Sequence, residues 1–224
     1  MGIHDGHRER VRQRYLNAGL DAFDDVQVLE LLLFHTIPRQ DTVPVARRLI
    51  ERFGGLASVL EASTDELRQV QGINTASAVL LTLFREVAKR HMRERVDPGK
   101  ILDTFDRCGD FLLPYFFGER DEVVYLLCLD GKLKVLNCQM MYRGSVNKVL
   151  VSARRLVETA VACGATYVVL AHNHTSGIAL PSRDDETATR NIADALSAVG
   201  IQLIDHIVVA NDDFVSMAQS GFPF

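Results

Sequence analysis

The stretch "ATYVVLAHNHTSGIALPSRDDETATRNIADALSAVGIQLIDHIVVA" (165–210) decides the fold class of this chain. Its first seven residues form an apolar, β-branched run typical of a buried strand, and "IQLIDHIVVA" at its end is a second such run. Between them, "SRDDETATRNIADALSAVG" predicts a helix that ends at Gly200, because glycine is favoured just beyond a last helical turn. Strands that alternate with helices predict an α/β sandwich, here a mixed sheet flanked by helices.

The segments around this stretch extend the same domain. "EVVYLLCLD" and "KLKVLNCQMM" are short apolar or β-branched runs, and the "DGK" between them predicts a hairpin turn. "SARRLVETAVACG" predicts a helix that ends at Gly164, and "FVSMA" predicts a last strand after "NDD". We expect residues 99–224 to form this α/β domain.

The first part of the chain has a different pattern. Apolar residues in "DDVQVLELLLFHTI" recur at helical spacing, and Ser63 with Glu66 three residues later predicts a capped helix start. Residues 1–98 are therefore expected to form an all-helical domain, and "RVDPGK" (95–100) a linker. The overall fold class predicted is α+β.

Composition indicates a globular protein rather than a disordered one. The chain has 224 residues, 47% hydrophobic and 24% charged. Residues 1–98 balance 14 basic against 14 acidic side chains, whereas residues 99–224 hold 11 against 15, so only the first part has basic surface to spare. The four cysteines stand singly, which excludes a thiolate zinc ribbon and predicts reduced thiols. No apolar run approaches the roughly 18–20 residues of a membrane span, so we expect a cytoplasmic protein without a membrane partner.

Two histidines at the end of the first buried strand are candidate metal ligands. Residues i and i+2 of a strand point to the same face, so His172 and His174 can address one ion. Asp185 lies in the predicted first turn of the next helix, which can return a carboxylate over the strand end. Two histidines and one aspartate with an open fourth position are typical of a catalytic zinc site, where the metal lowers the pKa of water to about 7.

Other interpretations of these residues need no catalytic metal. Ser182 and Asp185 also match a capping box, and both histidines can be ordinary polar residues at a strand end. The letters "HNH" suggest a nuclease, but the buried strand before them argues against a ββα-metal site. A nucleotide deaminase is less favoured still, because the H-x-E and P-C-x-x-C patterns are missing.

The longer pattern settles much of this question by resemblance. "AHNHTSGIALPSRDD" resembles the H-x-H-P-x6-S-x2-D signature of JAB/MPN metalloproteases (the JAMM motif), and "RGSVN", "DHIVV" and "FVSM" are similar to the RadC branch. "RERVRQRYLNAGLDAFDDVQVLELLLFHTIPRQDT" also resembles the UPF0758-type helical domain that precedes it in RadC proteins. The resemblance implies a cytidine-deaminase-like α/β fold, with one Zn²⁺ per chain held by His172, His174 and Asp185, and with Ser182 stabilising an oxyanion or water. It also implies hydrolysis of an amide or isopeptide bond in a protein or peptide, and a link to DNA repair.

Three departures from the family pattern bear on catalysis. Thr175 replaces the proline after the second histidine, and "SARR" (152–155) stands where other members carry His-Pro-Arg. The family's general-base glutamate stands five residues before the glycine of a Gly-Ser/Thr pair, here Gly144–Ser145, which gives Gln139. An amide cannot accept a proton at neutral pH. Either a nearby carboxylate substitutes, with Glu122, Asp184 and Glu186 as the candidates, or the hydrolytic activity is weak or absent. The alternative function is a non-catalytic, DNA-associated binding module.

The helical part contains a candidate nucleic-acid reader. "LRQVQGINTASAVLL" has the h-x-G-h-x-x-x-x-A core of a helix-hairpin-helix, in which Gly72, Ile73 and Asn74 would offer backbone N–H groups to DNA phosphates. Asn74 replaces a usual second glycine and is expected to tolerate left-handed geometry. The alternative is an ordinary turn between packed helices. The arginines at positions 8, 10, 12 and 14 are either phosphate contacts or a solvated helix face.

The remaining histidines carry weaker signals. His35, His91 and His206 are interpreted as ordinary surface or core residues. Asp205 and His206 form one further hypothesis, a pair beneath the sheet that supports the metal ligands from behind.

Overall fold

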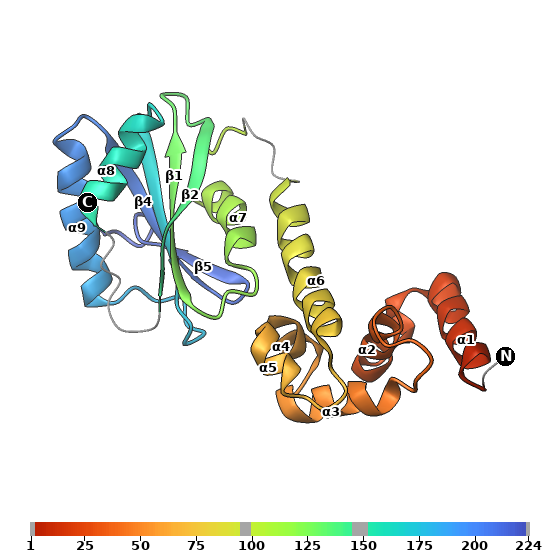
Figure 1. Cartoon of the computed structure of the whole chain (residues 1–224). Helices are drawn as coiled ribbons and strands as arrows, with labels where there is room; N and C mark the ends of the chain where they lie inside the picture. The colour runs from red at the N-terminus through yellow and green to blue at the C-terminus, as the bar shows by residue number, and fades with distance from the viewer. Residues whose placement is uncertain (1–2, 95–99, 145–151, 223–224) are drawn as a thin grey trace. The chain divides into compact units, whose positions relative to one another are not determined.

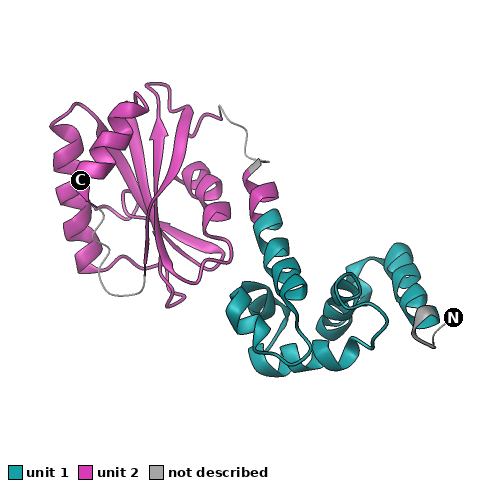
Figure 2. Ribbon diagram, viewed as in Figure 1, with its two compact units in different colours: residues 1–88 teal, residues 89–224 magenta. Residues whose placement is uncertain are grey.

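The computed structural model describes residues 3–94, 100–144 and 152–222, whose contacts divide the chain into two compact units. The first unit comprises residues 1–88 and the second residues 89–224 (Figure 2). The predicted domain boundary after residue 98, most of the predicted linker and Ser145 lie outside the described residues.

The first unit is helical throughout its described part (Figure 1). A core of mainly aliphatic side chains, including Leu29, Leu49 and Leu81, lies between its helices. The predicted start at Ser63 is confirmed, because the Ser63 hydroxyl accepts from Glu66 N and the Glu66 carboxylate accepts from Ser63 N. The elements are α1 (Ile3–Ala18), the 3₁₀ helix η1 (Leu20–Ala22), α2 (Asp25–Leu33), α3 (Val43–Phe53), α4 (Leu56–Glu61), α5 (Thr64–Arg68) and α6 (Thr75–Glu94), whose last turns belong to the second unit.

Arg8 has a structural role that neither sequence interpretation of the N-terminal arginines foresaw. Its side chain is buried, and its guanidinium donates to the carbonyls of Phe34, Ile37 and Gln40 at 3.3, 2.6 and 2.8 Å. These carbonyls follow the end of α2, where helix carbonyls lack partners within the helix. Arg8 is therefore neither a phosphate contact nor part of a solvated face.

The second unit contains the predicted mixed sheet, in the strand order β2-β1-β3-β4-β5. β3 and β4 are parallel, and the other neighbouring strands are antiparallel. None of the described helices is long and apolar enough to cross a membrane. The elements are α7 (Phe105–Phe116), β1 (Glu122–Leu129), β2 (Val135–Gly144), α8 (Ala153–Ala162), β3 (Tyr167–Asn173), α9 (Arg183–Ser197), β4 (Gln202–Ala210) and β5 (Asp213–Ser216).

Helices cover both faces of the sheet, which confirms the predicted sandwich. α7 lies on one face, and α8 and α9 lie on the other (Figure 1). β1 is an inner strand and is buried along almost its whole length, because both of its faces pack against helices. The hairpin between β1 and β2 turns where Asp130 accepts from the backbone N–H groups of Lys132 and Lys134. All four cysteines are free in the structure.

Candidate metal centre

The two histidines of the "HNH" sequence lie at the end of β3, on the face covered by α9. His172 is 3% exposed and pairs with Val124 of β1. His174 follows the strand, and its N–H donates to the carbonyl of Val209 at 2.8 Å, so the alignment with β4 continues beyond the last strand residue. The i, i+2 spacing thus brings both imidazoles to one side, with their Nε2 atoms 2.9 Å apart.

Asn173, between the two histidines, fixes the strand end. Its Oδ1 accepts from the N–H of Val123 at 2.7 Å, and its Nδ2 donates to the carbonyl of Asp121 at 3.0 Å. This side chain therefore joins the end of β3 to the start of β1. Sequence reasoning did not identify this role, because it depends on which strand lies beside β3.

Asp185 completes the cluster from the first turn of α9. Its Oδ1 lies 3.3 Å from His172 Nε2, and its Oδ2 lies 3.4 Å from His174 Nε2. One ligand atom from each of the three residues lies within 4.8 Å of the others. The capping box is also present, since Asp185 Oδ2 accepts from Ser182 N at 2.7 Å and from Ser182 Oγ at 2.6 Å. The capped helix and the ligand cluster are therefore compatible, and the cap holds the carboxylate in place.

The pKa shifts in the cluster give two of its three members the protonation state that a metal ligand requires. Burial lowers the pKa of His172 to about 4, against the opposing effect of Asp185, so its imidazole is neutral at pH 7. Burial by itself raises the pKa of Asp185, but the hydrogen bonds with His174 and Ser182 and the electrostatic effect of the nearby His172 ring outweigh it and lower that pKa. The hydrogen bond to Asp185 raises the pKa of His174. A metal at this site competes with a proton mainly on His174.

The outer ring nitrogens of both histidines have internal partners. His174 Nδ1 lies 3.2 Å from the carbonyl oxygen of Ile178, and only a protonated nitrogen can donate there. His172 Nδ1 lies 2.7 Å from His206 Nε2. If both histidines carry their proton on Nδ1, the lone pairs of both Nε2 atoms point toward the carboxylate of Asp185 at short range. These electron-rich groups repel one another, and a cation bound among them would remove that repulsion. Two imidazole nitrogens and one carboxylate oxygen are a donor set that fits zinc.

Thr189 is a functional candidate that sequence reasoning missed, and His206 lies behind the metal ligands as one hypothesis had it, but with other partners. His206 was interpreted as an ordinary histidine or as the partner of Asp205, but its ring contacts His172 and, through Nδ1, the hydroxyl of Thr189 at 2.5 Å. Both side chains are buried, with exposed fractions of 3% and 0%. Burial lowers the pKa of His206 well below its usual value, so this ring is neutral.

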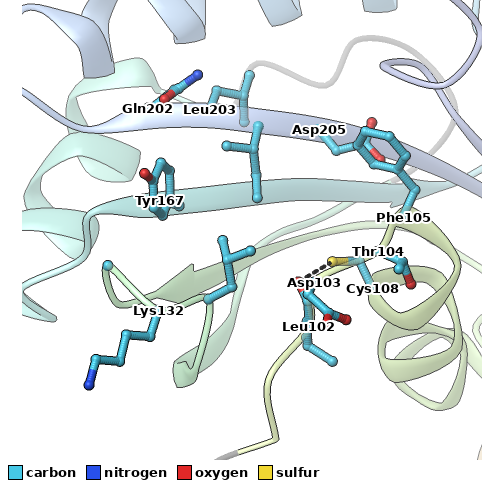
Figure 3. Close-up of a pocket in the computed structure, with 13 residues that line it drawn as sticks. Leu102, Asp103, Thr104, Phe105, Cys108, Lys132, Tyr167, Gln202, Leu203 and Asp205 are labelled. Atoms are coloured by element: carbon cyan, nitrogen blue, oxygen red, sulfur yellow. Dashed lines mark hydrogen bonds between the residues drawn. The ribbon is translucent and has the colours of Figure 1, made fainter.

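The predicted pairing of the Asp205 and His206 side chains is wrong. Asp205 Oδ1 accepts from the backbone N–H groups of His206 and Ala218 instead. Asp205 lines a cavity of about 610 Å³ together with Leu102 and Cys108 of the α7 region (Figure 3). The His206 ring instead faces α9, where it contacts Thr189. Neighbouring strand residues point to opposite faces, so these two side chains cannot meet.

Gln139 lies on the face of the sheet that carries the histidines, but further from the strand end. It pairs with Leu126 of β1, which pairs with Leu170 of β3, two residues before His172. Its side chain is exposed. Among the other candidates, Glu122 stands two residues before Val124 on β1, so both side chains share the face that carries the histidines. The charge of Glu122 contributes to the raised pKa of His174. Because it lies on the strand face that carries the histidines, we take Glu122 as the best placed of the three candidates.

The candidate nucleic-acid reader is a tight turn between α5 and α6. Gly72 has a φ of 96°, which glycine adopts without strain, and Ile73 is buried. Asn74 does not use the left-handed geometry that it was expected to tolerate, because positive φ among the described non-glycine residues occurs elsewhere. Asn74 instead caps α6, since its Oδ1 accepts from the N–H of Ser77 at 2.8 Å. A short polar side chain serves equally well in a cap or a left-handed turn, so composition alone could not separate the two.

Gly72 also permits a close approach that a larger residue would prevent. A Cβ added at Gly72 would lie 2.8 Å from Val45 Cγ2, whereas one added at Gly54, also at positive φ, would meet nothing within 4 Å. We expect Gly54→Ala to cost about 1–2 kcal/mol of unfolding free energy through backbone strain alone. Gly72→Ala should cost about 1–3 kcal/mol more through overpacking against Val45. Urea unfolding followed by circular dichroism checks this, and equal losses in the two variants would contradict the close approach.

The fold and the cluster together define a class of protein. A mixed five-stranded sheet between helices, with two histidines at a strand end and an aspartate in the first turn of the following helix, is consistent with a JAB/MPN domain. Residues 102–222 match the model of the RadC-like JAB domain family, and residues 6–79 match that of the UPF0758 N-terminal domain. The chain belongs to this RadC-like, UPF0758 family.

Relatives of similar length support this assignment along nearly the whole chain. A UPF0758 protein of Methylibium petroleiphilum is 35% identical over 212 residues, which cover 95% of this chain and 96% of the relative. A UPF0758 protein of Thioalkalivibrio sulfidiphilus is 35% identical, with 95% of each chain covered. One of Ectopseudomonas mendocina is 34% identical, with 96% of each chain covered.

Proposed function

We propose that this chain is a zinc-dependent hydrolase of an amide or isopeptide bond in a protein or peptide. His172, His174 and Asp185 would hold one Zn²⁺ per chain. The observation that carries the proposal is the convergence of two imidazole nitrogens and a carboxylate within 4.8 Å. When bound at such a site, zinc lowers the pKa of a water to about 7 and polarises a carbonyl.

Ser182 has a clear task in this proposal before any contact with substrate. Its hydroxyl lies 2.6 Å from Asp185 Oδ2 and donates its proton there, which orients the carboxylate toward the histidines. To stabilise an oxyanion as well, the same hydroxyl would have to turn its proton from Asp185 to the substrate. We therefore assign Ser182 first to positioning Asp185 and keep its role toward the oxyanion as a proposal.

The proton released by the attacking water needs an acceptor other than Gln139. We assign this task to Glu122, the first residue of β1. Its carboxylate shares the histidine face of the sheet and lies near enough to influence the pKa of His174. A carboxylate can take a proton at neutral pH, whereas the amide of Gln139 cannot.

Metal content of the purified protein is the direct test of the site. Protein prepared without chelator should contain about one zinc per chain by plasma mass spectrometry, and His172→Ala/His174→Ala should contain none. Zinc-loaded protein should then cleave members of a peptide and isopeptide panel. A wild-type chain that neither contains nor takes up zinc would refute the site, and cleavage that survives in the metal-free protein would refute the mechanism.

A second candidate function is binding of a DNA backbone by the first unit, with or without hydrolysis by the second. Two arginines of α3 lie beside the α5–α6 turn, and their positive charge favours DNA binding there. Arg48 Nε donates to the carbonyl of Gln71 at 3.0 Å, and Arg52 Nη2 donates to Gln69 Oε1 at 2.6 Å. The N–H of Ile73 donates to the carbonyl of Val70 within the turn at 3.1 Å, so the N–H groups assigned to phosphate contact are those of Gly72 and Asn74. Such N–H groups beside cationic side chains are suited to phosphate contact without base readout.

Salt dependence tests this second function. We expect duplex binding that weakens with salt, and Arg52→Gln should reduce the slope of log K against log salt by about one if Arg52 contacts one phosphate. Arg154→Gln is the control, because Arg154 is an exposed arginine of α8 paired with Glu158. His174→Ala should bind DNA as the wild type does. Absence of salt-dependent binding at low ionic strength would exclude this function.

A further inference from the structure

A buried chain of hydrogen bonds runs from one candidate metal ligand to the backbone of another. His172 Nδ1 lies 2.7 Å from His206 Nε2, and His206 Nδ1 lies 2.5 Å from Thr189 Oγ1. Thr189 Oγ1 in turn lies 2.6 Å from the carbonyl oxygen of Asp185, four residues earlier in α9. Three short contacts thus connect β3, β4 and α9, and they need three protons.

Only one direction of donation satisfies all three contacts with neutral groups. The Asp185 carbonyl can only accept, so the single hydroxyl proton of Thr189 must point to it. Thr189 then accepts from His206 Nδ1–H, and the lone pair of His206 Nε2 accepts from His172 Nδ1–H. The opposite direction would leave two oxygen atoms 2.6 Å apart without a proton between them.

We propose that His206 and Thr189 are positioning residues that set the tautomer of His172. This assignment rests on the proposed zinc function. In it, the carbonyl of Asp185 orients the hydroxyl of Thr189, which orients His206, and His206 in turn keeps the proton of His172 on Nδ1. The Nε2 lone pair of His172 is then directed at Asp185 and His174 before any metal arrives. A metal-ligating histidine commonly donates from its outer nitrogen to a carboxylate or carbonyl. Here the acceptor is a second histidine, His206, whose own orientation is fixed by the hydroxyl of Thr189.

The surroundings of the chain support a fixed arrangement. His172, His206 and Thr189 are 3%, 3% and 0% exposed, so water cannot readily replace a missing partner. His206 lies beside Leu170 in the pairing of β3 with β4, and its backbone is held by the strand ladder. Its ring is therefore held from both sides, by His172 and by Thr189.

The experiment is ring ¹⁵N NMR of the metal-free, full-length chain combined with zinc affinity by chelator competition. In the wild type, both His172 and His206 should be Nδ1–H tautomers. Thr189→Val removes the hydroxyl with little change in volume, and it should mix the tautomers and weaken zinc binding by about 10–100-fold. Thr189→Ser keeps the hydroxyl and should stay within about twofold of the wild type.

Thr187→Val is the matched control, because Thr187 makes the same type of bond to the carbonyl of Arg183 on an exposed part of α9. It should leave tautomers and affinity unchanged. An Nε2–H tautomer of His172 in the wild type would overturn the proposal even if Thr189→Val fails to fold. Unchanged tautomers and affinity in a folded Thr189→Val would overturn it too. Because the tautomers are measured without metal, a chain that binds no zinc would refute the proposed function and leave this measurement decisive.

Discussion

Asp185→Asn should weaken zinc binding by more than about a hundredfold, beyond the 10–100-fold typical of an outer partner, while helix α9 stays capped. The substitution removes the negative charge but keeps an oxygen that can accept from Ser182 N, so the cap survives in part. The variant separates the two possible roles of Asp185 in the Ser182–Asp185 pair, helix capping and metal binding. If this pair only caps the helix, the variant loses a little stability and no metal affinity. If Asp185 is a ligand, zinc affinity falls by the expected factor while the free energy of unfolding changes only slightly.

Asp184→Asn provides the matched control for this measurement. Asp184 stands one residue earlier in the same first turn of α9 and is exposed, outside the His172, His174 and Asp185 cluster. Chelator competition and thermal unfolding of both variants should show a large loss of affinity for Asp185→Asn alone. Equal affinities in the two variants would remove Asp185 from the metal site and leave two histidines, too few ligands for tight binding.

The sequence was sufficient for the candidate ligands because their arrangement follows from local rules. His172 and His174 share a face through strand alternation, and Ser182 fixes Asp185 through a three-residue capping pattern. Both patterns are short, so they can be read along the chain. The sandwich followed for the same reason, since its strands and helices alternate with clear turn residues between them.

The partners behind the ligands could not be read in this way. His206 lies 34 positions after His172, and their contact depends on the β3–β4 register, which shifts by one residue near Val168. Thr189 is one of several threonines and serines on α9, and its burial and its contact with His206, which depend on the tertiary fold, distinguish it from Thr187. Asn173 and Arg8 are similar cases, because each side chain satisfies backbone groups that are distant in the sequence.

Glu122→Gln should lower hydrolysis by about a hundredfold or more while zinc content stays near one per chain, because general bases contribute about 10²–10⁴. Family resemblance assigns the base to position 139 and strand register favours position 122, so Gln139→Glu is the competing test. We expect little gain from Gln139→Glu, since that side chain is exposed and lies two strand positions from the level of His172.

Glu186→Gln is the control for these two variants, because Glu186 lies on α9, within 3.9 Å of Arg190. The measurement is kcat/KM on a peptide that the zinc-loaded wild type cleaves. Unchanged hydrolysis in Glu122→Gln together with a large gain in Gln139→Glu would return the role to position 139, and the natural glutamine would then mark a chain with little hydrolytic activity of its own.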